Sequence, residues 1–217
     1  MESATQLFRQ RKDGFCHSES RWSAVAQMAF IWMSKEKNKD TYLNVFKSQY
    51  IKKKKNWLRA DSKFAFLNWS VLESSIVEGN IKDYFLHYFP KDTDIPNMKP
   101  DIVLIDKKND ETNIVIIEVK TVGAKVKGNI ENYKDLVEKI NLKPGYTCEL
   151  YYLMSYGHED SKLHADWSVL DEYDMNILLW EDLFINMEKL KCPLRDFITP
   201  FGDMKKWNKK ISEFKEG

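Results

Sequence analysis

The chain has 217 residues, of which 43% are hydrophobic and 13% are aromatic. This length fits one large domain, and this composition argues against intrinsic disorder. Its 34 basic and 33 acidic residues leave a formal charge of +1, so no global field draws the protein to nucleic acid or to an anionic membrane. A polyanionic partner would have to meet local basic patches.

The cysteines and the start of the chain indicate a compartment. Cys16, Cys148 and Cys192 are odd in number and form no CxxC pair, which argues against a disulfide framework and against a zinc knuckle. Residues 1–14 are polar, and no window approaches 18 uninterrupted apolar residues. We expect a cytoplasmic protein with no membrane partner.

The first part of the chain predicts helices. Residues 19–34 carry an apolar stripe at three- and four-residue steps, which is typical of an amphipathic helix. Residues 42–50 continue this pattern in a second short helix, and the lysine run that follows predicts a loop. A longer helix is expected over residues 61–79, and residues 80–90 fit either a helix end or a first strand.

A hairpin is predicted next. Pro100-Asp101 opens the apolar run at 102–105, and the apolar run at 114–117 leads directly into Glu118-Val119-Lys120. The polar stretch 107–111 between them has the composition of a hairpin turn. Both strands are predicted to be buried on two faces.

The remaining elements alternate between helices and strands. We expect helices over 129–142 and 160–173, strands over 148–154 and 175–180, and a last helix that begins at Glu181 and is closed by Pro193. No repeat or flexible linker divides the chain. The sequence therefore predicts one α/β domain, with a core over 61–217 and a helical N-terminal extension over 1–60 packed on it.

The hairpin carries the residues that point to chemistry. Asp101 and Glu118 place carboxylates on neighbouring strands, and Glu118 and Lys120 leave the same face of a strand because they are two apart. Hard cations such as Mg²⁺ prefer oxygen ligands, and the Val119 carbonyl is a third candidate. Lys120 could orient or deprotonate a water, or hold a phosphate against developing charge. The sequence predicts a metal site for phosphodiester hydrolysis.

Pro100-Asp101, Glu118-x-Lys120 and a preceding helix with a glutamate resemble the PD-(D/E)xK nuclease superfamily. The resemblance spans roughly 64–185 as an order of elements. It implies a restriction-endonuclease-like mixed central sheet flanked by helices, metal ligation by Asp101 and Glu118, and a catalytic Lys120. Mg²⁺ is the implied cofactor, for which Mn²⁺ can substitute.

The resemblance also implies a supporting acid from the earlier helix. Glu73 and Glu78 are the candidates, and we favour Glu73 because it shares a helical face with apolar neighbours, where a carboxylate needs a partner. Some nucleases of this kind place a glutamine and a tyrosine four apart on the next helix. Here Asn129 and Tyr133 hold that spacing, and Tyr133 could equally be a core residue.

Lysines supply candidate phosphate contacts. The expected nucleic-acid-binding residues are Lys52, Lys53, Lys54, Lys55, Lys125 and Lys127. A second basic cluster lies at 205–210. Solvated faces that keep the protein soluble are the alternative explanation for each cluster.

The resulting hypothesis is a metal-dependent nuclease whose partner is nucleic acid. DNA is preferred as the substrate by analogy with the family, and endonuclease action in restriction, defence, recombination or repair is expected. A homodimer is one way for a single site to cut both strands. The alternatives are an RNA endonuclease with the same site and a non-catalytic binding module of nuclease fold.

Overall fold

The computed structural model describes residues 19–35, 70–73, 90, 100–108, 110–120, 130–155, 176–189, 191–193 and 209. The helices expected over 42–50 and 160–173, the lysine loop and the segment 80–89 lie outside these residues.

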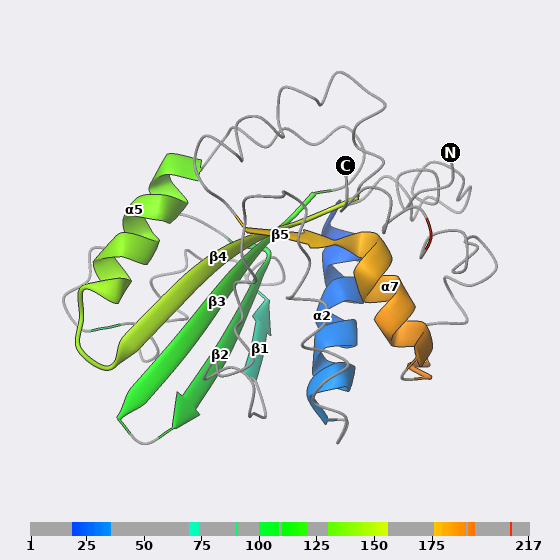
Figure 1. The fold of residues 1–217 in the computed structure, drawn as a ribbon, viewed down its shortest axis with the longest axis horizontal. Coiled ribbons are helices and arrows are strands. Elements are labelled where there is room, and N and C mark those ends of the chain that lie inside the picture. The colour runs from blue at the N-terminus through cyan, green and yellow to red at the C-terminus, as the bar shows by residue number, and fades with distance from the viewer. Residues whose placement is uncertain are drawn as a thin grey trace.

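A five-stranded mixed sheet forms the centre of the molecule (Figure 1). Its strands are β1 (Ser70–Glu73), β2 (Ile102–Lys108), β3 (Glu111–Val119), β4 (Tyr146–Met154) and β5 (Asn176–Leu179), in the spatial order β1-β2-β3-β4-β5. The first three strands pair antiparallel, and β3, β4 and β5 pair parallel. The expected α/β class with a mixed sheet is confirmed.

The predicted hairpin is formed by β2 and β3. Ile102 pairs with Ile117, and the pairing continues to Lys108 opposite Glu111, so the strands extend further into the polar stretch than the composition suggested. The apolar centres of both strands are buried, as expected for strands covered on two faces.

Helix α5 (Ile130–Asn141) connects β3 to the parallel strand β4, because parallel neighbours need a crossover rather than a tight turn. This helix agrees with the predicted 129–142, and β4 contains the predicted strand 148–154. The buried stripe of α5 is Ile130, Tyr133, Leu136 and Ile140.

The last predicted strand and helix are also present. Strand β5 covers residues 176–179, and α7 (Trp180–Lys189) follows at once, so Trp180 begins the helix rather than ending the strand. The helix ends before Lys191, whose φ of 53° is left-handed, and so does not continue to Pro193.

Helix α2 (Glu19–Lys35) agrees with the predicted helix 19–34 and belongs to the hydrophobic core. Its buried Trp22 contacts the rings of Trp180 and Phe184 in α7, with centroids 5.9 and 6.2 Å apart. Figure 1 shows α2 and α7 together on one side of the sheet and α5 on the other. No described helix is both long and apolar enough to cross a membrane.

The helix predicted over 61–79 is wrong at residues 70–73, which form strand β1. Val71 pairs with Leu104, and Glu73 pairs with Ile102. Without β1, the apolar strand β2 would present unpaired backbone groups at the edge of the sheet, and pairing satisfies them. This long-range pairing overrides the helical spacing of the apolar residues.

Candidate metal centre

The hairpin brings the predicted acids to one end of the sheet. Asp101 directly precedes β2, Glu118 is the penultimate residue of β3, and Lys120 follows it. The antiparallel register that pairs Ile102 with Ile117 brings Asp101 opposite Glu118. Because β3, β4 and β5 are parallel, the carboxyl-terminal ends of all three strands lie at this end of the sheet.

Asp101 is held in place by two elements. Its Oδ2 accepts a hydrogen bond of 2.8 Å from the backbone N–H of Val119, and its Oδ1 accepts a longer one of 3.4 Å from the Ser23 hydroxyl of α2. The residue is half-buried. The first contact ties the carboxylate to the end of β3, next to Glu118.

Both carboxylate oxygens of Glu118 accept hydrogen bonds. Lys120 Nζ lies 2.7 Å from Oε1, and the Tyr133 hydroxyl donates to Oε2 at 2.8 Å. The side chains of Lys120 and Glu118 are 10% and 13% exposed, so the ion pair lies at the rim of the core. A charge-assisted pair in this setting is less screened than one on the open surface.

The tyrosines around Glu118 are held neutral. Burial raises the pKa of Tyr133 far above its ordinary value, and the charge and hydrogen bond of Glu118, followed by the charge of Asp101, raise it further. The pKa of Tyr152 is also raised, first by burial and then by the charge of Glu118. Both phenols therefore keep their protons at neutral pH, Tyr133 donates its proton to Glu118, and the charges of both predicted acids raise the pKa of Tyr133.

The backbone of Lys120 is fixed from two sides. Its N–H donates to the Leu153 carbonyl of β4 at 2.9 Å, and its carbonyl accepts a 3.0 Å hydrogen bond from Trp180 Nε1 of α7. Lys120 is 8% exposed as a whole. These contacts limit where its ammonium group can move.

The donor set fits a hard divalent cation. Asp101 and Glu118 offer carboxylate oxygens, and the described residues contain no cluster of three or more His, Cys, Asp or Glu side chains that could hold a metal by themselves. The Val119 N–H points toward Asp101. Because the carbonyl of a strand residue points the same way as its N–H, the Val119 carbonyl also faces the Asp101 side. Two carboxylates and one backbone oxygen suit Mg²⁺, which retains several waters, better than they suit zinc.

The structure thus brings Asp101, Glu118, Val119 and Lys120 together. Glu73 lies on β1 with its backbone opposite Ile102, on a strand and not on a helix. Several other residues singled out in the sequence lie outside the described residues. They are the alternative supporting acid, the amide four residues before Tyr133, and the lysines expected to contact nucleic acid: Glu78, Asn129, Lys52, Lys53, Lys54, Lys55, Lys125 and Lys127.

Two contacts of the site were not assigned from the sequence. Ser23 reaches Asp101 from α2, and Tyr152 lies beside Glu118 on β4. No spacing signal connects either residue to the hairpin. Tyr133 carried such a signal, but the sequence left its role open between the site and the core.

Comparison with family models, with curated proteins and with solved structures found no match to this chain.

Proposed function

We propose that this protein is a divalent-metal-dependent nuclease, with DNA as its preferred substrate and endonuclease action. The observation that carries the proposal is the junction of Asp101, Glu118 and Lys120 at the ends of two adjacent strands, where the backbone of Val119 already contacts Asp101. This arrangement brings together, in one place, the carboxylates and the amine that phosphodiester hydrolysis requires.

Asp101, Glu118 and the Val119 carbonyl would hold the cation. Mg²⁺ or Mn²⁺ bound there supplies charge neutralisation of the scissile phosphate and a water of lowered pKa. The chain's own contribution is to place the two carboxylates. Val119 N–H and Ser23 orient Asp101, and Tyr133 orients Glu118. Such outer contacts fix the ligand geometry.

Lys120 supplies the positive group at the reacting centre. Its ammonium lies 2.7 Å from Glu118 and therefore beside the proposed ligands. From there it can orient the attacking water or interact with the negative charge that develops on the phosphate.

The supporting acid was expected on a helix, but Glu73 belongs to strand β1, where its backbone pairs with Ile102 next to Asp101. Glu73 stays our proposed supporting acid, from a strand that neighbours β2.

Cleavage assays with purified protein test the proposal. Wild type and Lys120→Ala are incubated with plasmid DNA, linear DNA and single-stranded RNA, with Mg²⁺ and with chelator. Wild type should cut DNA only with the metal, and Lys120→Ala should lower kcat by about 10²- to 10⁴-fold, the usual contribution of such a group. Lys139→Ala is the matched control, because Lys139 pairs with Asp135 on an exposed helix face and should be dispensable.

Metal binding separates the alternatives. Calorimetry with Mn²⁺ should show binding to wild type and Lys120→Ala, and loss of binding in Asp101→Ala and Glu118→Ala. Faster cleavage of RNA than of DNA would favour an RNA endonuclease. Absence of both Mn²⁺ binding and cleavage in wild type would favour a non-catalytic binding module.

The biological setting is proposed only by analogy. Enzymes of restriction, defence, recombination and repair act on DNA in this way, and we keep a cytoplasmic location as part of the proposal. A homodimer would let one site per chain cut both strands.

A further inference from the structure

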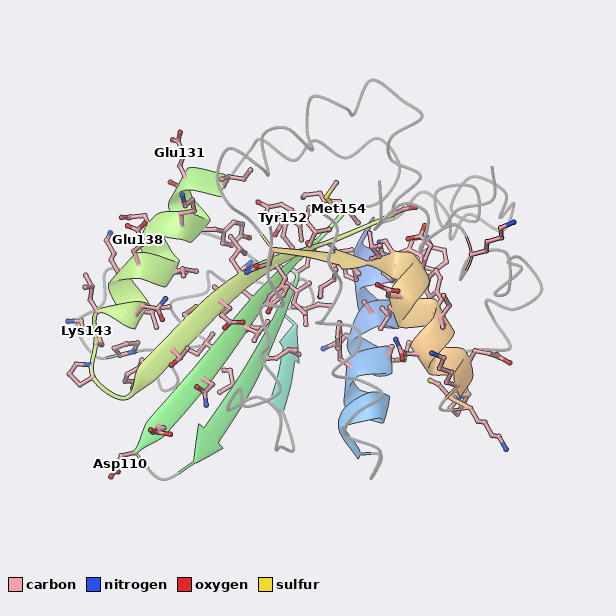
Figure 2. All side chains as sticks on the ribbon, in the orientation of Figure 1. Asp110, Glu131, Glu138, Lys143, Tyr152 and Met154 are labelled. Carbon is pink, nitrogen blue, oxygen red and sulfur yellow. The ribbon has the colours of Figure 1, made fainter. Side chains whose placement is uncertain are left out.

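Tyr152 is a buried tyrosine whose hydroxyl is hydrogen-bonded to none of the described residues. The residue is 1% exposed and lies on β4, where the parallel register pairs it with Glu118 of β3. Paired residues of neighbouring strands present their side chains on the same face of the sheet. Tyr152 and Glu118 therefore share a face, and Figure 2 shows Tyr152 near the carboxyl-terminal end of β4.

The pairing of Tyr152 with Glu118 is accompanied by an electrostatic interaction between the two side chains. The charge of Glu118 raises the pKa of Tyr152, and Tyr152 in turn contributes to the raised pKa of Tyr133. Two tyrosines from different elements thus feel the charge of the same carboxylate, Tyr133 from α5 and Tyr152 from β4.

The two tyrosines differ in what their hydroxyls contact. Tyr133 donates to Glu118 at 2.8 Å. Among the described residues, no group is hydrogen-bonded to the Tyr152 hydroxyl, and this oxygen is not one of the buried polar atoms that lack a partner, so it is not sealed from solvent. A buried ring with an unused hydroxyl needs an explanation, because phenylalanine would fill the same space.

We propose that the Tyr152 hydroxyl donates a hydrogen bond to a non-bridging oxygen of the phosphate that is bound at Asp101 and Glu118. This inference rests on the proposed function and adds a substrate contact to it. Tyr152 lies beside Glu118, and Lys120 pairs with the same Glu118, so the phosphate would be held between a neutral donor on β4 and an ammonium group after β3.

The contact should matter most in the transition state. Negative charge on the phosphate oxygens is greatest there, and a hydrogen bond to a charged acceptor is stronger than one to a neutral acceptor. Loss of such a bond lowers the rate by about 10- to 100-fold.

Tyr152→Phe is the test, because it removes the hydroxyl and retains the ring. We expect kcat for DNA cleavage at saturating Mn²⁺ to fall by about 10- to 100-fold. KM, Mn²⁺ affinity and the urea midpoint should stay at the wild-type values, because the hydroxyl has no partner in the described protein. Wild-type kcat in Tyr152→Phe would overturn the inference, and so would a rate loss accompanied by loss of Mn²⁺ affinity or stability.

Tyr151→Phe is the matched control. Tyr151 is also a buried tyrosine of β4, but it lies on the opposite face, and its hydroxyl donates to Glu149 at 2.8 Å. This variant should lose stability and retain wild-type kcat. If Tyr152→Phe instead lost stability and retained wild-type kcat, while Tyr151→Phe lost kcat, the Tyr152 hydroxyl would be assigned to packing.

A binding assay keeps the inference separate from the nuclease proposal. If wild type cuts neither DNA nor RNA, the nuclease proposal fails, and anisotropy of a labelled DNA duplex with Ca²⁺ then tests Tyr152 alone. An affinity about 10-fold weaker in Tyr152→Phe would support the phosphate contact. Equal affinity of wild type and Tyr152→Phe would reject it.

Discussion

At the scale of single residues, the site depends on how Glu118 is held. Its two carboxylate oxygens contact an ammonium group from the same strand end and a phenol from α5. Lys120 follows Glu118 along the chain, whereas Tyr133 belongs to the next helix. The orientation of one acid therefore combines a local contact with one from a separate element.

Tyr133→Phe tests the contribution of that helix. Removal of the hydroxyl leaves Oε2 of Glu118 without its donor, so the free energy of unfolding should fall by about 1–2 kcal/mol. Mn²⁺ affinity should fall by about 10-fold, because Glu118 loses a contact that orients it. Urea unfolding and calorimetry measure the two effects. A stability loss with unchanged Mn²⁺ affinity would show that Tyr133 serves the core only.

At the scale of elements, the turn between α5 and β4 sets where the second half of the sheet begins. Asn141 at the end of α5 donates to the Cys148 carbonyl and accepts from the Cys148 N–H, which fixes the helix end against the strand. Gly145 then adopts a φ of 77°, and its carbonyl accepts a 2.8 Å hydrogen bond from Thr112 N. The turn thus joins α5, β4 and the start of β3.

Gly145→Ala should destabilise this turn. The positive φ is costly for a residue with a Cβ, and a Cβ at this position would lie 2.6 Å from the Asp110 backbone carbonyl oxygen. We expect a loss of at least about 2 kcal/mol in the free energy of unfolding, measured with urea. Lys143→Ala in the same turn is the control and should change stability by less than about 0.5 kcal/mol. Equal stability of the two variants would contradict the argument.

At the scale of the whole molecule, the core contains ionisable groups that must stay neutral. Burial is the main cause that raises the pKa values of Cys148, Tyr133, Tyr151 and Tyr152, and nearby carboxylates raise them further. Their ordinary values are 9.0 for the thiol and 10.0 for the phenols. The unfolded chain therefore releases these protons at a lower pH than the folded protein does.

Stability should accordingly fall in alkaline solution. Below about pH 9 all four groups are protonated in both states, so their contribution to stability is fully present. Above pH 9 for Cys148 and above pH 10 for the tyrosines, the unfolded state binds fewer protons, and each group lowers the free energy of unfolding by about 1.4 kcal/mol per pH unit.

Urea midpoints from pH 8 to pH 11 measure this loss. Cys148→Ala should remove the part of the slope that begins near pH 9, and Tyr151→Phe should reduce the slope above pH 10. A midpoint that stays constant across this range would show that these groups ionise in the folded protein as readily as in the unfolded chain.

The hairpin and its acids were predictable from the sequence because they are local. Two apolar runs separated by a short polar stretch lose little chain entropy when they pair with each other. This pairing brings Asp101 opposite Glu118. The helices at 19–35 and 130–141 were likewise visible from their apolar spacing.

Other features depended on contacts between distant segments. The adjacent apolar residues of 70–73 fit a helix or a strand, and only the open edge of β2 selects the strand. Ser23, Tyr133 and Tyr152 come from α2, α5 and β4, and their distance to the acids depends on how those elements pack. The candidate residues for the proposed chemistry could thus be named from local sequence patterns alone. The tertiary structure decided which side chains surround them, because packing between elements far apart along the chain leaves no periodic pattern in the sequence.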